Sequence, residues 1–319
     1  MKYGDIGLLL PSRGLVIGGV DPVPIDILNK LAQRADSGGF DSVWVGDSLI
    51  AKPRLEPLSL LGSIAAITNN VRIGTAVLLG ALREPILLAQ AAATVDLVSK
   101  GRLNLGIGVG GGFNKDQQGE WIAAGIDQKT RAKRFEEIVE IIKLLWSGET
   151  INFQGDHFNL EEVSLGFRPF QRPTIPIRLA THSGPGREKQ YLRAAKIADG
   201  IISISDSPDE FRQVISNVET EAKNLNRNTE HFHNVYYLTV NINDNHDAAL
   251  KESDDWIKKY YGLNFWTDKW GPFGSTSAIK DRIIQYFQSG ADEVVVRFAS
   301  YDQPGQLDQF EQKILPELL

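Results

Sequence analysis

Short apolar runs alternate with longer amphipathic stretches along the 319 residues of this chain. The short runs are typical of buried strands, whereas the longer stretches repeat apolar residues at spacings of three and four, which is typical of helices. A strand followed regularly by a helix predicts parallel strands covered by helices, an α/β architecture. The predicted strands span residues 5–10, 42–45, 72–79, 103–109, 175–180, 200–205, 235–242 and 294–298.

Eight strands, each followed by a helix, favour a closed (β/α)8 TIM barrel over an open dinucleotide-binding sheet, which usually has about six strands. Runs such as 43–45 and 294–296 are apolar throughout, as expected for parallel strands that are buried on both faces. We expect a single domain over residues 1–319 with two small insertions. Residues 148–173 contain a predicted hairpin, and residues 262–276 form a loop rich in Trp and Gly.

Two predicted helices, at 58–68 and 85–99, are apolar on more than one side. A helix of this kind is buried on several faces. A thick core would explain the pattern, and so would contact with a second copy of the chain. Of the two explanations we favour a homodimer interface.

Composition narrows the location and the partners of the protein. The chain has no cysteine, which excludes disulfides, thiolate metal sites and a cysteine nucleophile. The net charge is −6 with both signs mixed, so nucleic acid is not an expected partner. No stretch is long and apolar enough to cross a bilayer, and no signal-peptide pattern opens the chain. We therefore expect a cytoplasmic protein with no membrane partner.

Histidine spacing gives little support for a metal site. Of the five histidines only His231 and His233 are close in sequence. They precede the seventh predicted strand and so belong to the noncatalytic end of a barrel. We interpret them as surface residues and expect no metal.

In a barrel of this kind, functional residues follow the C-terminal ends of the strands. The fourth strand ends in a glycine-rich segment, residues 106–112, which includes Gly108, Val109 and Gly110. Its G-x-G-x-x-G match is no Rossmann fingerprint, because it closes the fourth strand rather than the first. Glycines there allow a flat ligand to lie against the main chain. A flexible loop is the alternative explanation.

The fifth strand leads into a segment typical of an anion site. Free amides at the start of the following helix and the helix dipole attract a phosphate, and an arginine adds a full positive charge. A plain serine cap with a turn is the alternative. The candidate residues are His182, Ser183, Gly184, Pro185, Gly186 and Arg187.

Two further candidates come from the second strand and from the late loop. Asp47 follows the second strand, where a carboxylate would act as a general base or accept a hydrogen bond from a ligand ring. Capping of a loop is an equally common role. Trp266, Trp270 and Phe273 form either a lid or substrate wall or the anchors of a surface loop, and both possibilities stay open.

Several ordered segments together resemble the bacterial luciferase-like superfamily of flavin-dependent oxidoreductases. The similarity is strongest over residues 39–47, 72–77 and 93–103, with further matches at 105–112 and 198–200. The resemblance implies a barrel that binds reduced FMN or, in a sister branch, the deazaflavin F420.

The same resemblance assigns parts of the cofactor to parts of this chain. It implies a non-prolyl cis peptide between Ala76 and Val77, forming a bulge against the isoalloxazine ring. It also implies that residues 183–186 hold the cofactor phosphate, and that residues 108–110 line the ring or the ribityl chain.

Departures from the family pattern shape the predicted activity. Ser48 stands where luciferases and many F420 enzymes have a histidine, and the reactive cysteine of luciferases is absent. Both disfavour light emission, and Ser48 weakens the F420 interpretation. We therefore predict an FMN-dependent monooxygenase that acts on a small organic substrate with reduced flavin and oxygen, with a separate flavin reductase as a candidate partner. The alternatives are F420-dependent hydride transfer, a noncatalytic flavin-binding protein and an unrelated barrel hydrolase that binds a sugar phosphate.

Overall fold

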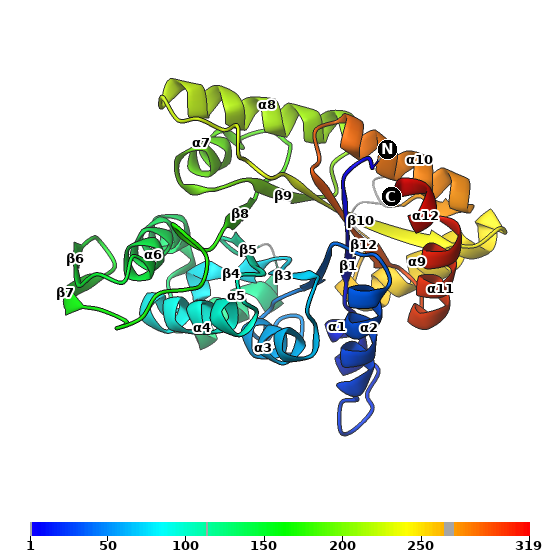
Figure 1. Ribbon diagram of the computed structural model, residues 1–319, viewed down its shortest axis with the longest axis horizontal. Helices are drawn as coiled ribbons and strands as arrows, with labels where there is room; N and C mark the ends of the chain where they lie inside the picture. The colour runs from blue at the N-terminus through cyan, green and yellow to red at the C-terminus, as the bar shows by residue number, and fades with distance from the viewer. Residues whose placement is uncertain (1, 113, 265–270) are drawn as a thin grey trace.

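The computed structural model describes residues 2–112, 114–264 and 271–319. Within these residues eight parallel strands form a closed ring, because each pairs with the next and the last pairs with the first (Figure 1). The predicted (β/α)8 TIM barrel is therefore confirmed. In ring order the strands are β1 (Asp5–Leu9), β2 (Ser42–Val45), β3 (Arg72–Thr75), β5 (Leu103–Gly108), β8 (Ile177–Ala180), β9 (Ile201–Ile204), β10 (Val235–Ile242) and β12 (Glu293–Phe298).

Helices surround this ring of strands (Figure 1). Their apolar faces pack on the strands, and their starts follow local rules. For example, α8 begins at a capping box in which the Glu210 amide donates to Ser207 Oγ at 3.2 Å and the Ser207 amide donates to the Glu210 carboxylate at 2.7 Å. The helices that follow the strands are α2 (Asp26–Ser37), α3 (Pro57–Ile67), α4 (Pro85–Val98), α6 (Arg131–Trp146), α7 (Glu188–Ile197), α8 (Pro208–Asn224), α9 (His246–Tyr261), α10 (Thr276–Gln288), α11 (Gln303–Lys313) and α12 (Leu315–Leu318).

Several short elements differ from the sequence prediction. The strand predicted at 72–79 is divided into β3 and β4 (Leu78–Leu79), and the peptide bond between Ala76 and Val77 is cis, as the resemblance implied. Two helices were not predicted, α1 (Ser12–Ile17) and α5 (Lys115–Ala123). A two-residue strand, β11 (Phe273–Gly274), pairs with β10 inside the predicted late loop.

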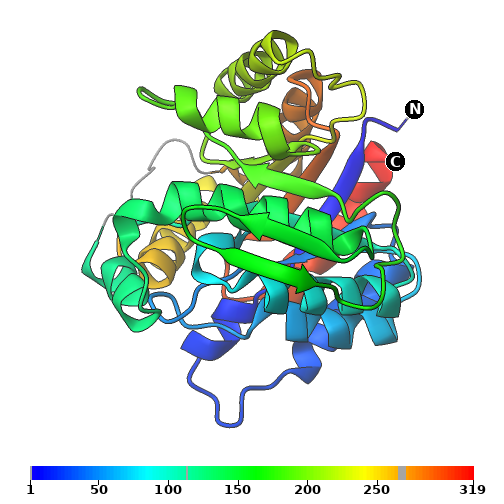
Figure 2. The same ribbon diagram turned by 90° about the vertical axis from the view of Figure 1, so that its left-hand side faces the viewer.

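The predicted hairpin is present and lies outside the barrel. Strands β6 (Ile151–Gln154) and β7 (Asn159–Val163) pair antiparallel, and Figure 2 shows them packed in front of α6. Glu137 of α6 fixes the turn, because its carboxylate accepts the backbone amides of residues 156–158 at 2.9–3.2 Å. The insertion is therefore tied to the outer helices and leaves the mouth of the barrel open.

Trp44 fills the centre of the barrel. It is fully buried, and its indole Nε1 donates to Ser42 Oγ at 2.7 Å and to Glu293 Oε1 at 2.8 Å. Glycines face it on both sides: a Cβ on Gly74 would lie 2.5 Å from the indole ring, and a Cβ on Gly7 would lie 3.0 Å from Nε1. The large residue on β2 therefore requires residues without side chains on β3 and β1.

An ion-pair network closes the end of the barrel below Trp44. Arg72 contacts Asp5 at 2.7 Å and the fully buried Glu293 at 3.1 Å. His233 lies 3.7 Å from Asp5, and this contact together with Arg72 holds the pKa of Asp5 well below its usual value. Contrary to the surface position predicted for both histidines, only His231 is exposed, whereas His233 is half-buried in this network.

Three side chains of this network, Asp5, His233 and Glu293, are of the types that bind metal ions. Ligand atoms of Asp5, His233 and Glu293 lie within 4.8 Å of one another. Both carboxylates, however, already pair with Arg72. Because their charges are compensated, we interpret the group as a structural ion-pair network at the noncatalytic end.

Substitution of the glycine beside Trp44 tests this packing. We expect Gly74→Ala to lower the free energy of unfolding by about 1–3 kcal/mol, because the added methyl group overlaps the indole ring. The control is Gly62→Ala in α3, where a Cβ would meet Val95 at 3.9 Å and the change should stabilise the helix by about 0.5–1 kcal/mol. Urea unfolding measures both, and equal stability of the two variants would refute the constraint.

Candidate functional site

A cavity of about 610 Å³ opens at the C-terminal ends of β4, β5, β8 and β9. This volume is within the range of small-molecule and cofactor sites. It brings together eight residues singled out from the sequence: Val77, Gly108, Val109, Gly110, His182, Ser183, Gly186 and Arg187. Ala76 packs beside Val77 against the interior of the barrel, while Gly184 and Pro185 lie exposed next to the cavity.

Gly108 keeps one end of the cavity narrow but open. A Cβ at this position would lie 3.1 Å from the Ala180 Cβ and 3.2 Å from Val77 Cγ2. Any larger residue on β5 would therefore fill the space between β4 and β8. The result is a slot with little side-chain bulk, suited to a flat ring.

The glycine-rich segment after β5 is held in place by α5. Gly110 has a positive φ of 89°, a conformation that favours glycine. Trp121 packs against it, and the Trp121 Nε1 donates to the Gly111 carbonyl at 2.7 Å. These contacts argue against the alternative of a loose loop.

The other end of the cavity is strongly cationic. Ser183 donates its amide to Asp206 at 3.1 Å, so this amide already has an acceptor. The amides of Gly184 and Gly186, both with positive φ, have no acceptor among the described residues. Asp206 is the carboxylate among the lining residues, whereas the lining cations are Arg131, Arg187, Lys189 and Arg193.

His182 contributes a neutral polar wall to the cavity. Its Nδ1 lies 3.1 Å from Ser203 Oγ, which in turn donates to Asp206. Burial lowers the pKa of His182 although Asp206 opposes the effect. Burial therefore favours the neutral imidazole, and the lining residues with a permanent positive charge are arginine and lysine.

Asp47 does not face the cavity with free oxygens. Its buried carboxylate accepts the Leu79 amide at 2.8 Å and lies 2.8 and 2.9 Å from Nη2 of Arg83. Burial raises the pKa of Asp47, and Arg83 opposes this shift. These contacts hold the segment after Val77 in place, so Asp47 has the geometry of a loop anchor. Its catalytic role stays a prediction.

Ser48 belongs to a buried network that the sequence did not reveal. Its hydroxyl donates to Glu120 at 2.7 Å, and the same carboxylate oxygen accepts the amides of Ile50 and Ala51 at 2.8 and 3.0 Å. Glu120 comes from α5 and is 4% exposed. A hydroxyl at position 48 therefore serves to anchor the loop after β2.

A group of arginines across the mouth was also missed. Arg13 follows β1, Arg54 lies in the loop after β2, and Arg297 is near the end of β12. All three guanidinium groups lie within 5.8 Å of the centre of the Tyr260 ring. The signal available in the sequence was the charge of Arg297 inside the predicted strand 294–298, which is otherwise apolar.

The aromatic residues of the late loop are only partly described. Trp266 and Trp270 lie outside the described residues. Phe273 is buried in β11 and packs with Trp256 and Tyr260 of α9. For this residue the structure shows a core anchor, in keeping with the second of the two roles considered for the loop.

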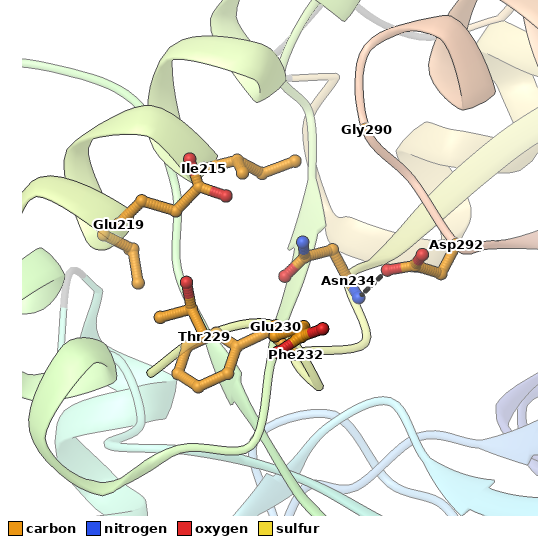
Figure 3. Close-up of a pocket in the computed structure, with 9 residues that line it drawn as sticks. Ile215, Glu219, Thr229, Glu230, Phe232, Asn234, Gly290 and Asp292 are labelled. Carbon is orange, nitrogen blue, oxygen red and sulfur yellow. Dashed lines mark hydrogen bonds between the residues drawn. The ribbon is translucent and has the colours of Figure 1, made fainter. Parts of the chain in front are cut away.

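A smaller cavity of about 310 Å³ lies at the opposite end of the barrel (Figure 3). Asn234 precedes β10 and Asp292 precedes β12, and the Asn234 amide donates to the Asp292 carboxylate at 2.7 Å. Glu219 and Glu230 also line it. Its acidic lining and its place at the N-terminal ends of the strands set it apart from the cationic cavity at the mouth.

Comparison with known proteins agrees with this geometry. A model of the luciferase-like monooxygenase family matches residues 5–305. The chain belongs to this family. An F420-dependent glucose-6-phosphate dehydrogenase from Amycolatopsis mediterranei is 27% identical and aligns over 92% of this chain and 95% of its own. The resemblance seen in the sequence is confirmed, and the protein is a luciferase-like oxidoreductase.

Two solved structures of the luciferase-like fold superpose on the whole barrel. One is an F420-dependent secondary alcohol dehydrogenase in complex with an F420–acetone adduct, with a TM-score of 0.81, 18% identity and coverage of 100% of both chains. The other is the oxygenating constituent of 3,6-diketocamphane monooxygenase of Pseudomonas putida in complex with FMN, with a TM-score of 0.75, 19% identity and coverage of 99% of both chains. At these identities the likeness concerns the fold.

The length and hydrophobicity of a helix determine whether it can cross a membrane. Among the described residues, none of the helices combines the length and the hydrophobicity that crossing a bilayer requires.

Removal of the Glu120 carboxylate tests the network around Ser48. We expect Glu120→Ala to lower the free energy of unfolding by about 1–3 kcal/mol, because a buried hydroxyl and two amides lose their acceptor. Proteolysis should also become faster within residues 49–56. Lys115→Ala, an exposed change on the same helix, is the control and should stay within about 0.5 kcal/mol of the wild type. If both variants behave alike, the network does not anchor the loop.

Proposed function

We propose that this protein is an F420-dependent oxidoreductase that transfers a hydride to or from a small organic substrate. The observation that carries the proposal is the cavity at the strand ends, which joins a narrow slot at Val77 and Gly108 to a cationic end with Arg131, Arg187 and Lys189. A ring with a long anionic tail fits that distribution of shape and charge. Relatives named for F420 favour this alternative over the FMN monooxygenase predicted from the sequence.

The residues present fit such a group from end to end. Val77 and Gly108 would face the ring, since a larger side chain at position 108 would close the slot. The amides of Gly184 and Gly186, together with Arg187, would hold the phosphate. When bound, F420 supplies two-electron hydride chemistry. Asp47, anchored to Leu79 and Arg83, would position the bulge that carries Val77.

The charge of the cavity supports F420 over a cofactor with one phosphate. Four cations line it against one carboxylate, and Arg193 is the member that pairs with a nearby acid, Glu136, at 2.6 Å. The tail of F420 carries carboxylates in addition to its phosphate, so it would use more positive charge than FMN does. Charge-assisted hydrogen bonds from arginine to these carboxylates are strong enough to favour F420 over FMN.

An FMN-dependent monooxygenase is the second candidate. The observation that favours it is Ser48, which is bound to Glu120 at the position where many F420 enzymes have a histidine. In either case the substrate is a small molecule, and the side chains around the mouth would exclude water and orient it. A separate flavin reductase would be needed only by the monooxygenase.

Titration with each cofactor tests the proposal. We expect the purified protein to bind F420 and to reduce it without oxygen when offered alcohol or sugar-phosphate substrates, followed as loss of F420 absorbance. Gly108→Val should weaken F420 at least tenfold, which is about 1.4 kcal/mol, because the new side chain fills the slot. Gly119→Ala is the matched control, since a Cβ there meets no atom within 4 Å.

Each other outcome of this titration has a definite meaning. Binding of FMN alone, with oxygen consumption in the reduced state, would favour the monooxygenase. Tight FMN binding without turnover would favour a flavin-binding protein. Failure of both cofactors to bind would overturn the proposal.

We also propose a homodimer formed through α4. Leu87, Leu97 and Val98 of this helix are 65%, 42% and 46% exposed, and exposed apolar surface that forms a patch marks interaction sites. Leu87→Glu should reduce the mass measured by light scattering to that of a monomer. Leu250→Glu on α9, at a position 48% exposed, should not. A monomeric wild type would contradict this assembly.

A further inference from the structure

Three guanidinium groups converge on one aromatic ring that does not belong to the lining of the cofactor cavity. The carbon Cζ lies 4.9 Å from the Tyr260 ring centre for Arg13, 5.8 Å for Arg54 and 5.2 Å for Arg297. Tyr260 itself stacks on Trp256 with ring centres 4.6 Å apart. Three positive charges therefore lie close to the stacked rings of Tyr260 and Trp256.

Arg13 and Arg54 form no ion pair with the described acidic residues, and Asp47, which Arg54 affects electrostatically, pairs with Arg83. Among the described residues, no carboxylate lies within 4.0 Å of either guanidinium group. Arg13 is 6% exposed, and its buried Nε and Nη1 make no hydrogen bond to any residue that the structure describes. Within the described part of the chain, Arg54 donates one hydrogen bond, from Nε to the Lys52 carbonyl at 3.3 Å. A buried guanidinium group without hydrogen-bond acceptors destabilises the protein unless an anion binds to it.

The third arginine is held firmly and adds to the local charge. Arg297 donates to the Tyr261 hydroxyl at 2.5 Å and to Thr239 Oγ1 at 2.7 Å. Burial raises the pKa of Tyr260, but Arg54, Arg297 and Arg13 together bring that pKa below its usual value. The surroundings of the ring therefore favour negative charge.

Arg54 also reaches the place proposed for the cofactor ring. A Cβ on Gly46 would overlap Nη1 of Arg54 and would lie 3.5 Å from the Ala76 carbonyl oxygen. The guanidinium group therefore lies beside the Ala76–Val77 bulge. An anion bound there would be next to the ring and would leave the remainder of its molecule over the ring.

The cofactor phosphate has its own site on the far side of the barrel. Residues 183–187 follow β8, and Arg13 follows β1. In the ring of strands, β8 is four positions away from β1. In an eight-stranded ring this is the opposite side. One cofactor phosphate cannot serve both sites, so the second cationic site is available to the substrate.

We propose that the substrate carries a carboxylate or phosphate group that binds to Arg13 and Arg54 beside the Tyr260 ring. This inference rests on the proposed function, since it names the chemical class of the substrate of the same site. Arginine suits this role because its planar donors match the oxygens of both anions. The rest of the substrate would extend over the cofactor ring.

Anion binding to the cofactor-saturated protein tests the proposal. Inorganic phosphate and malonate serve as probes in calorimetric titrations, and the two arms distinguish a phosphate from a carboxylate group. We expect one or both to bind, and Arg54→Gln to weaken binding at least tenfold. Arg212→Gln is the control, since Arg212 is an exposed residue that pairs with Asp209 on α8 and should leave the affinity unchanged.

The second variant and the apo-protein keep the outcomes separate. Arg13→Gln should weaken the same anion, and should Arg13→Gln fail to fold, the half-buried Arg54 still provides the test. Unchanged anion affinity in Arg54→Gln, or no binding by the wild type, would overturn the proposal. So would an equal loss of cofactor affinity, which would assign the arginines to the cofactor. Anion binding is also measured without cofactor, so the anion affinities can be interpreted even if the protein does not bind F420.

Discussion

The packing of Trp44 in the barrel determines where a ligand can enter. Its indole ring occupies the central layer and requires glycine at positions 7 and 74. Above it, small residues stand at the ends of four neighbouring strands. They are Gly46 after β2, Ala76 after β3, Gly108 on β5 and Ala180 on β8, and the cavity opens beside Gly108 and Ala180. The barrel is thus closed below by a large side chain and left open above by small ones.

The other half of the mouth has the opposite character. On β10 and β12, Thr239 and Arg297 pair with each other, and the segments after β1 and β2 add Arg13 and Arg54. One half of the mouth therefore offers a slot with little bulk, and the other offers charged and aromatic side chains. A planar cofactor and an anionic substrate would fit these two halves without competing for the same contacts.

Local rules predicted the parts of the site that lie close together in sequence. The segments at 108–110 and 182–187 were predicted because glycine at a strand end and small residues at a helix start have direct physical meanings. The fold followed from the alternation of strands and helices. The arginine group could not be predicted in this way, since residues 13, 54 and 297 meet only when the barrel closes.

Other misses have equally specific causes. Helix α5 (Lys115–Ala123) has no amphipathic repeat, so its Glu120 could not be connected with Ser48. For Asp47 the sequence left two roles open, a carboxylate facing the mouth and a loop cap, and its contacts with Arg83 and Leu79 fit the loop cap. Short elements such as α1 and β11 are too brief to give a periodic signal.

The most direct test of this account is a crystal structure of the protein with its cofactor bound. The account predicts the ring against Val77 and Gly108, the phosphate at residues 184–187, and the open face of the ring toward Arg13 and Arg54. A cofactor ring bound over Tyr260, or at the acidic cavity at the other end of the barrel, would contradict it.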